Sequence, residues 1–138
     1  MGPSVLQGAI REAERATLVA IRLQGLRNSI ADSLHPHLDG LIEGVQMTAL
    51  YLRDVADKSQ VYLYRVPEVI DYLNIVLPCL SLTLRDITAY YEDTSRRKES
   101  RWRLMYHKMS DELVGTTLPA RFVMYNQFLT SLLLLLSR

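Results

Sequence analysis

Apolar residues recur at spacings of three and four along almost the whole chain, and this feature restricts the fold more than any other. Strict alternation of apolar and polar residues, which marks a half-buried strand, is confined to a short run at residues 61–66. With only six glycines and five prolines among 138 residues, long elements are rarely interrupted. The pattern predicts one all-α domain, residues 1–138, folded as an irregular four- to five-helix bundle with long antiparallel helices.

Two helices are expected in the first half of the chain. The first covers residues 4–34, and Pro36 is expected to stop it. The second covers residues 37–56. Its two glycines, Gly40 and Gly44, lie four residues apart on one side, so another backbone can approach that side closely.

The second half is expected to hold the remaining helices. Pro67 suits the first position of a third helix, and Pro78 should kink that helix because it removes a backbone donor. The apolar stripe lapses at residues 92–95, so we expect a break there and a fourth helix from about Arg96; one continuous helix is the alternative. Thr117 fits the N-cap of the fifth helix.

A basic block is the clearest departure from charge balance. The chain has sixteen basic and fifteen acidic residues, yet six of the basic ones lie within residues 96–108. One interpretation is a solvated face; the other is a docking surface for an acidic protein, for the headgroups of an anionic membrane surface or for phosphate. Nucleic acid is not expected as a partner, because no recognition motif accompanies the block. The candidate partner-binding residues in this block are Arg96, Arg97, Arg101 and Arg103.

The position of the basic residues along the helices refines this prediction. Cations are favourable at the C-terminal end of a helix and unfavourable in its first turn. We therefore expect the residues Arg96, Arg97 and Lys98 to cap the end of the third helix, and Trp102 to pack in the core rather than at a membrane. Arg101 and Arg103 are then the basic residues that capping does not explain.

Five consecutive leucines, residues 132–136, end the fifth expected helix. They cannot all face one core, so some of them must meet something beyond simple bundle packing. Leu134 and Leu135 are the candidate contact residues. We expect either that the natural chain continues, as a fragment of a longer multidomain protein would, or that this end forms a homo-oligomer contact.

The composition predicts a soluble, cytoplasmic domain. The longest nearly continuous apolar run, residues 128–136, is about half of the roughly 20 residues that span a bilayer. The one cysteine, Cys79, excludes an intrachain disulfide and indicates a reducing compartment. Its apolar surroundings predict a buried, inert thiol.

No catalytic signature is present. The sequence lacks a glycine-rich phosphate loop, a nucleophile elbow and a zinc-protease motif, so we expect no enzyme, no cofactor and no small-molecule substrate. A pocket opened by a kink at Pro78, near Asn74, is the alternative that would suit an enzyme or ligand carrier. One polar cluster is interpreted as a turn rather than a zinc site, because no cysteine or remote third ligand accompanies it. That cluster consists of Asp32, His35, His37 and Asp39.

Residues 65–132, beginning RVPEVIDYLNIVLPCLSL, resemble the helical N-terminal region of large multidomain proteins of filamentous fungi, some of which are similar to the signalling arms of NLR-type receptors. More broadly, the segment resembles HeLo and HeLo-like bundles, which oligomerise and perturb membranes in fungal cell death. The chain departs from the HeLo pattern at its start, where GAIREAERATLVAIR replaces a hydrophobic stretch. The resemblance assigns no functional residues.

Two functions follow from the residues and the resemblance together. The first is a non-enzymatic protein-interaction and signalling module of a cytoplasmic multidomain protein, with a protein as its partner. The alternative is a HeLo-like bundle that oligomerises and acts on an anionic membrane surface in cell-death signalling.

Overall fold

The structure is a computed structural model that describes residues 2–61, 66–111 and 117–137. Within these ranges the chain forms five α-helices and one 3-10 turn, and no strand. The elements are α1 (Gly2–Arg27), the turn η1 (Asp32–Leu34), α2 (His35–Val61), α3 (Val66–Tyr91), α4 (Lys98–Asp111) and α5 (Leu118–Ser137). The predicted all-α bundle is confirmed.

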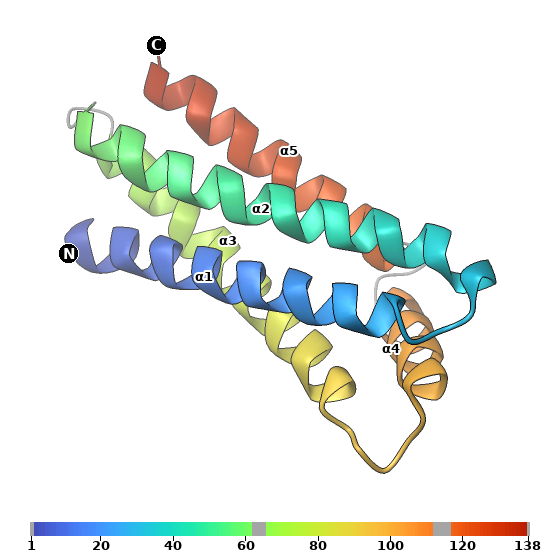
Figure 1. Cartoon of the computed structure of the whole chain (residues 1–138). Coiled ribbons are helices and arrows are strands. Elements are labelled where there is room, and N and C mark those ends of the chain that lie inside the picture. The colour runs from blue at the N-terminus through green and yellow to red at the C-terminus, as the bar shows by residue number, and fades with distance from the viewer. Residues whose placement is uncertain (1, 62–65, 112–116, 138) are drawn as a thin grey trace.

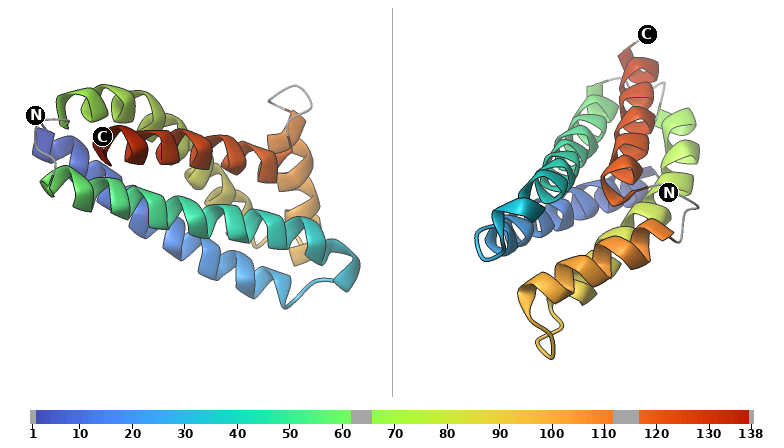
Figure 2. Two further views of the ribbon diagram at one scale, coloured as in Figure 1. Left: turned by 90° about the horizontal axis from the view of Figure 1, so that it is seen from above. Right: turned by 90° about the vertical axis from the view of Figure 1, so that its right-hand side faces the viewer.

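The four long helices form a four-sided bundle with one loosely closed side (Figure 1). α1 and α2 are antiparallel neighbours, whereas α5 packs on α2 and α3 packs on α1 in parallel orientation. α3 and α5 border the fourth side and touch far less than the other three pairs. The consecutive helices α2 and α3 therefore lie diagonally across the bundle, as the end view of Figure 2 shows.

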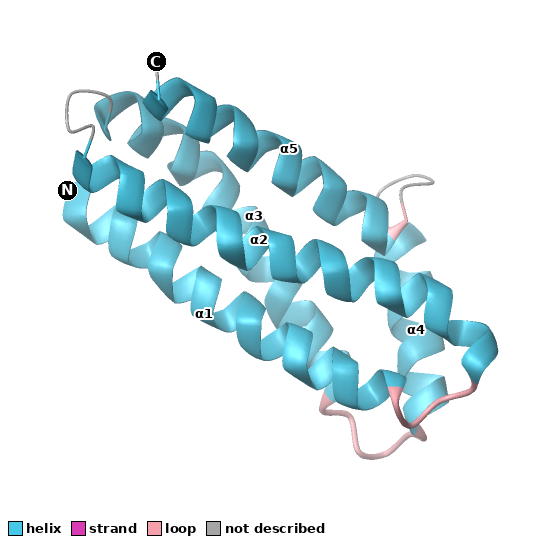
Figure 3. Ribbon diagram, turned by 45° about the horizontal axis from the view of Figure 1, so that its top comes forward, coloured by secondary structure: helices cyan, strands magenta, loops and turns pink. Residues whose placement is uncertain are grey.

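α4 is short and lies at the end of the bundle where α1 ends and α2 begins, while both termini lie at the other end (Figure 3). Its Trp102 and Met105 side chains are buried, so the prediction that Trp102 belongs to the core is confirmed. Tyr106 connects α4 to α2: its ring lies 5.4 Å from the rings of both Trp102 and His37, measured between centroids. These aromatic contacts hold α4 against the first turn of α2.

α1 contributes small side chains to the core along most of its length and two leucines, Leu23 and Leu26, near its C-terminal end. α1 buries alanines at successive turns, which lets its backbone lie close to that of α2. Apolar burial of this extent is the main stabilising contribution to a bundle. The largest fully buried side chains include Leu23, Leu38, Leu52, Leu73, Leu84, Ile87 and Phe122.

The first helix ends earlier than predicted. α1 stops at Arg27 rather than near residue 34, and the chain then turns through η1. Pro36 does not stop a helix; it lies in the first turn of α2, where a missing N–H breaks no helical hydrogen bond. α2 is correspondingly longer at both ends than the predicted residues 37–56.

α3 and α4 are two separate helices and not one continuous helix, and the basic block lies in α4 and in the loop before it. α3 ends at Tyr91 and α4 begins at Lys98. Between them the carboxylate of Asp93 accepts hydrogen bonds from the backbone N–H of Ser95, at 3.1 Å, and from its hydroxyl. These bonds lower the pKa of Asp93 and stabilise a tight turn. Arg96 adds an ion pair with the same carboxylate at 3.5 Å.

Two further local predictions are confirmed. Thr117 caps α5, because its hydroxyl oxygen accepts a hydrogen bond of 3.2 Å from the backbone N–H of Ala120. Pro78 lies inside α3, and the helix changes direction along its length in the left view of Figure 2.

Candidate functional site

Arg101 joins the end of α3 to the start of α4. Its Nη1 donates to the carbonyl of Tyr91 at 3.1 Å, and its Nε donates to the carbonyl of Arg96 at 2.9 Å. A guanidinium at the last carbonyls of a helix satisfies unpaired acceptors and the negative end of the helix dipole. Arg101 is therefore a capping residue, and the prediction that capping leaves it unexplained is wrong.

The three residues predicted to cap α3 are Arg96, Arg97 and Lys98, and the structure places them differently. Arg96 pairs with Asp93, and the Nζ of Lys98 donates to the hydroxyl of Ser29 at 3.2 Å. Arg97 is exposed. The misassignment has a geometric reason: the loop turns the chain back, so Arg101, one turn into α4, reaches the carbonyl of Tyr91 at the end of α3.

Three of the four predicted arginines border a shallow hollow of about 600 Å³ at the start of α4, and Arg96 is not among the residues that line it. Arg97, Arg101 and Arg103 line it together with Glu99. Glu99 accepts a hydrogen bond of 3.1 Å from the backbone N–H of Ala31, which ties α4 to the loop after α1. With Arg101 engaged in capping, Arg97 and Arg103 are the exposed arginines of this hollow that a partner can reach.

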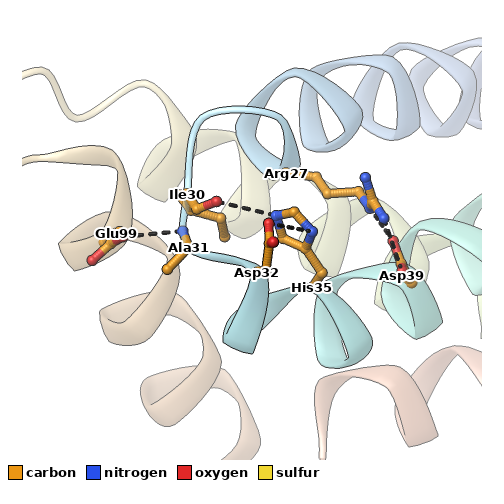
Figure 4. A network of polar contacts seen from close by, with 7 residues as sticks. All are labelled: Arg27, Ile30, Ala31, Asp32, His35, Asp39 and Glu99. Atoms are coloured by element: carbon orange, nitrogen blue, oxygen red, sulfur yellow. Dashed lines mark hydrogen bonds and ion pairs between the residues drawn. The ribbon is translucent and has the colours of Figure 1, made fainter.

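The polar cluster at the α1–α2 turn connects neighbouring elements (Figure 4). The guanidinium of Arg27, at the end of α1, binds both carboxylate oxygens of Asp39 in α2. The Nε2 of His35 lies 3.1 Å from the carbonyl oxygen of Ile30, and its Nδ1 lies 3.6 Å from a carboxylate oxygen of Asp32. These contacts join the end of α1, the turn and the start of α2.

Metal binding at this cluster has no geometric support. In the described part of the chain, no three His, Cys, Asp or Glu side chains come together in a way that could hold a metal ion. His37 contacts Tyr106 instead of facing His35. Asn74 and Pro78, near which the alternative prediction places a ligand pocket, both lie exposed on the surface of α3.

A groove opens along the loosely closed side of the bundle. The hydroxyl of Tyr125 in α5 lies 2.8 Å from that of Thr83 in α3 and donates to the carbonyl of Cys79 at 3.3 Å. Beyond this crossing the two helices border a hollow of about 430 Å³. It is lined by Tyr72, Phe128, Ser131, Leu132, Leu134 and Leu135.

The groove contains both leucines that the sequence singled out. Leu134 is 71% exposed and Leu135 is half-buried, whereas Leu132 and Leu136 are buried in the core. The prediction that the leucine run cannot all face one core is confirmed. Sequence reasoning missed the two aromatic residues of the groove, Tyr72 and Phe128, whose rings meet edge to face at 6.1 Å.

No formal charge interrupts the helices along this groove. Residues 72–84 of α3 and residues 122–137 of α5 contain no Asp, Glu, Lys or Arg. The first acidic residues before the uncharged segment of α3 are Glu68 and Asp71, both exposed. Contiguous exposed apolar surface of this kind commonly marks an interaction site.

Cys79 is exposed, so the prediction of a buried thiol is wrong. It lies on the outward stripe of α3, between Ile75 and Leu82, while the inward stripe at Leu73, Leu80 and Leu84 enters the core. The surrounding residues are apolar on both sides of α3. Composition therefore could not separate the face that the bundle covers from the face that it leaves open.

α3 is the one described helix that is long and apolar enough to cross a membrane by length and composition. Its most apolar 18-residue window has a mean hydropathy of 1.3, and 28% of that window is buried inside the bundle. Core helices of soluble proteins meet the same criterion.

Comparison with known proteins provides no relative: no protein-family model, no curated protein and no solved structure matches the chain. The resemblance to the helical regions of fungal signalling proteins therefore stays a prediction.

Proposed function

We propose that the chain is a non-enzymatic protein-interaction module of a cytoplasmic signalling protein, and that it binds an amphipathic helix between α3 and α5. The observation that carries the proposal is the uncharged groove lined by Tyr72, Phe128, Leu134 and Leu135 on the loosely closed side of the bundle. A helix with one apolar stripe is the ligand that suits a groove between two helices, because its side chains interdigitate with both walls.

The charges near the groove specify the ligand further. Its walls can neither attract nor repel a charged stripe, so the bound face of the partner helix should be apolar over about three turns. Glu68 and Asp71 lie exposed near one end of α3, next to the apolar segment. Lys or Arg at the corresponding end of the partner helix would be complementary to these two carboxylates.

The basic hollow at α4 supplies a second, weaker contact in this proposal. Arg97 and Arg103 are exposed there, at the end of the bundle away from both termini, and would meet acidic residues of the partner outside its bound helix. Exposed charges of this kind increase the association rate more than the affinity. Arg96 and Arg101 take no direct part, because the first pairs with Asp93 and the second caps α3.

The groove can be probed with a synthetic fluorescein-labelled helix that has a leucine stripe, an uncharged polar face and a lysine-rich end. Fluorescence anisotropy should show saturable binding to the wild type. Leu134→Lys and Tyr72→Lys, both at exposed sites, should weaken it by at least about tenfold. The matched control is Leu50→Lys, at an exposed leucine on α2 outside the groove lining.

Two outcomes of this titration contradict the proposal. Equal loss in the Leu50→Lys control would mean that the peptide adheres to any exposed leucine. No saturable binding by the wild type would exclude a helix of this chemistry as the groove ligand.

A membrane-acting, HeLo-like bundle is the second candidate function, and the apolar length of α3 is the observation that favours it. The outward face of that helix carries Glu68 and Asp71, which an anionic membrane repels. Flotation and dye-release assays with phosphatidylserine-containing vesicles at low salt test this candidate. Co-flotation with dye release would support it over the groove proposal, and no association would exclude it.

A further inference from the structure

We infer that the basic hollow at the start of α4 binds a phosphate monoester, carried by a phosphorylated serine or threonine of a protein partner. This inference deepens the second contact of the proposed function, and it rests on that proposal in taking a protein as the partner. It names the chemical group that the hollow recognises. The helix-binding groove is lined by other side chains and is tested by other variants.

The hollow concentrates positive charge. Four of its lining side chains are cationic and one is a carboxylate, which gives a net charge of +3 in a chain whose overall net charge is only +1. The cations are Arg97, Lys98, Arg101 and Arg103, and the carboxylate is that of Glu99. Opposite charge on a ligand is therefore the main requirement that the hollow imposes.

None of the four cations is neutralised by a carboxylate of the described part of the chain. The Nζ of Lys98 donates to the neutral hydroxyl of Ser29 at 3.2 Å, and Arg101 donates to two backbone carbonyls. Arg97 and Arg103 form neither a hydrogen bond nor an ion pair with any residue that the structure describes. The positive charge of the hollow thus remains available to an anion.

The one carboxylate of the hollow is already engaged. An oxygen of Glu99 accepts a hydrogen bond of 3.1 Å from the backbone N–H of Ala31, so it is turned toward the loop after α1 (Figure 4). Together with the bond from Lys98 to Ser29, this contact fixes the start of α4 against that loop. The cations are held near one another before a ligand arrives, which lowers the entropic cost of binding.

A phosphate fits this charge better than a carboxylate does. A phosphate monoester carries a charge of about −1.5 to −2 at neutral pH and has three acceptor oxygens, whereas a carboxylate carries one charge and has two. The planar guanidiniums of Arg97 and Arg103 can each offer two parallel N–H donors to such an anion. Arg97 and Lys98 also lie at the start of α4, where the helix dipole disfavours cations, and a bound dianion offsets that repulsion.

The surroundings favour a protein over a membrane as the carrier of the phosphate. No large apolar side chain lines the hollow, and the nearby Trp102 and Met105 are buried in the core. Helices that bind at a membrane surface present exposed Trp, Phe or Leu to the lipid, and the described part of α4 has no exposed large apolar side chain. The volume of about 600 Å³ accommodates a phosphorylated side chain with the backbone next to it.

A fluorescein-labelled peptide of about ten residues tests the inference. It contains glycine, alanine and asparagine around one phosphoserine, so it has no leucine stripe for the groove. Fluorescence anisotropy should show saturable binding to the wild type, and the unphosphorylated peptide should bind at least about tenfold more weakly. Inorganic phosphate should displace the phosphopeptide at a lower concentration than chloride does at equal ionic strength.

Two arginine variants identify the donors. Arg97→Gln and Arg103→Gln should each weaken phosphopeptide binding by at least about fivefold, because each removes a charged, bidentate donor. The matched control is Arg11→Gln, which removes the same charge at an exposed position of α1 outside the hollow. This control should bind the phosphopeptide as the wild type does.

A substitution at Ser100 separates binding from folding. Ser100 is exposed in the first turn of α4 and lines the hollow, so Ser100→Glu places a carboxylate where the phosphate would bind. Because an anion in the first turn of a helix is favourable, this variant should melt at or above the wild-type temperature. It should nevertheless bind the phosphopeptide at least about tenfold more weakly, whereas the uncharged Ser100→Gln should bind it as the wild type does.

Three results would overturn the inference. The first is equal affinity for the phosphorylated and unphosphorylated peptides, and the second is binding by Arg97→Gln and Arg103→Gln that equals binding by Arg11→Gln. The third is binding to vesicles that contain phosphatidylinositol phosphate without binding to the phosphopeptide, which would assign the hollow to a membrane. The groove variant Leu134→Lys should leave phosphopeptide binding unchanged, so failure of this inference and failure of the helix-binding groove are distinguishable.

Discussion

Gly44 in α2 and Phe122 in α5 are packed so closely that a Cβ atom added to Gly44 would lie 2.9 Å from the Cβ of Phe122. One turn earlier, a Cβ on Gly40 would lie 3.8 Å from the Cβ of Pro119, at ordinary contact distance. The prediction that these two glycines admit another backbone is thereby confirmed, with α5 as the approaching helix. Close approach here positions the whole of α5, including the leucines that line the groove.

A polar clamp next to this contact holds the same two helices together. The side-chain N–H of Asn126 in α5 donates to the carbonyl of Gly44 at 3.1 Å, and the hydroxyl of Thr48 lies 2.6 Å from the side-chain oxygen of Asn126. Thr48 is buried, so these bonds replace water that the groups would otherwise need.

Substitution of the two glycines should have opposite effects on stability. Gly44→Ala forces α2 and α5 apart and should destabilise the fold by about 1–3 kcal/mol, which exceeds the gain in helix propensity of about 1 kcal/mol. Gly40→Ala keeps that gain without a clash and should be neutral or stabilising. Urea unfolding followed by circular dichroism measures both; a Gly44→Ala protein as stable as Gly40→Ala would disprove the close contact.

Substitution of Arg101, which caps α3, should lower stability more than substitution of an exposed arginine. Arg101→Ala leaves the carbonyl of Tyr91 without its charged donor and should cost about 1–2 kcal/mol, reduced from the buried value because the site is partly exposed. Arg103→Ala, on the exposed side of the same helix, should change stability by less than about 0.5 kcal/mol. Thermal unfolding compares them, and equal melting temperatures would contradict the capping role.

The contact of α5 with α3 should weaken at alkaline pH. Burial raises the pKa of the Tyr125 phenol, although its hydrogen bond with Thr83 opposes part of that rise. The unfolded chain ionises Tyr125 near its ordinary pKa of about 10, and the folded chain only at higher pH. The stabilising contribution is therefore complete below about pH 10 and is lost as the pH rises through the folded pKa.

The measurement for Tyr125 is the free energy of unfolding between neutral and strongly alkaline pH, for the wild type and for Tyr125→Phe. The variant should be less stable at neutral pH, since it loses the bonds to Thr83 and Cys79. Its stability should fall less steeply above pH 10. Parallel slopes for the two proteins would show that Tyr125 does not contribute to the alkaline loss.

The leucine run should divide into core and surface residues on mutation. Leu132→Ala removes a buried side chain and should cost about 2–5 kcal/mol. Leu134→Ala removes an exposed one and should change the free energy of unfolding by less than about 0.5 kcal/mol. Chemical denaturation distinguishes the two, and a large loss at Leu134 would place that side chain in the core instead of the groove.

The sequence by itself determined the class of fold and most of the core. Apolar spacing predicted long helices, and the residues at Leu73, Leu80 and Leu84 are buried as that spacing requires. Local chemistry also sufficed for the cap at Thr117 and for the break before α4, because both depend on residues within a few positions of each other.

Only the tertiary structure decided which surfaces stay open. Ile75, Cys79 and Leu82 are as apolar as the buried residues beside them, so burial depended on where α1 and α5 lie and not on composition. The role of Arg101 was hidden for a similar reason: the carbonyl that it caps is ten residues away and comes near only when the chain turns back. Helix formation depends on neighbours in sequence, whereas exposure and capping across a loop depend on neighbours in space.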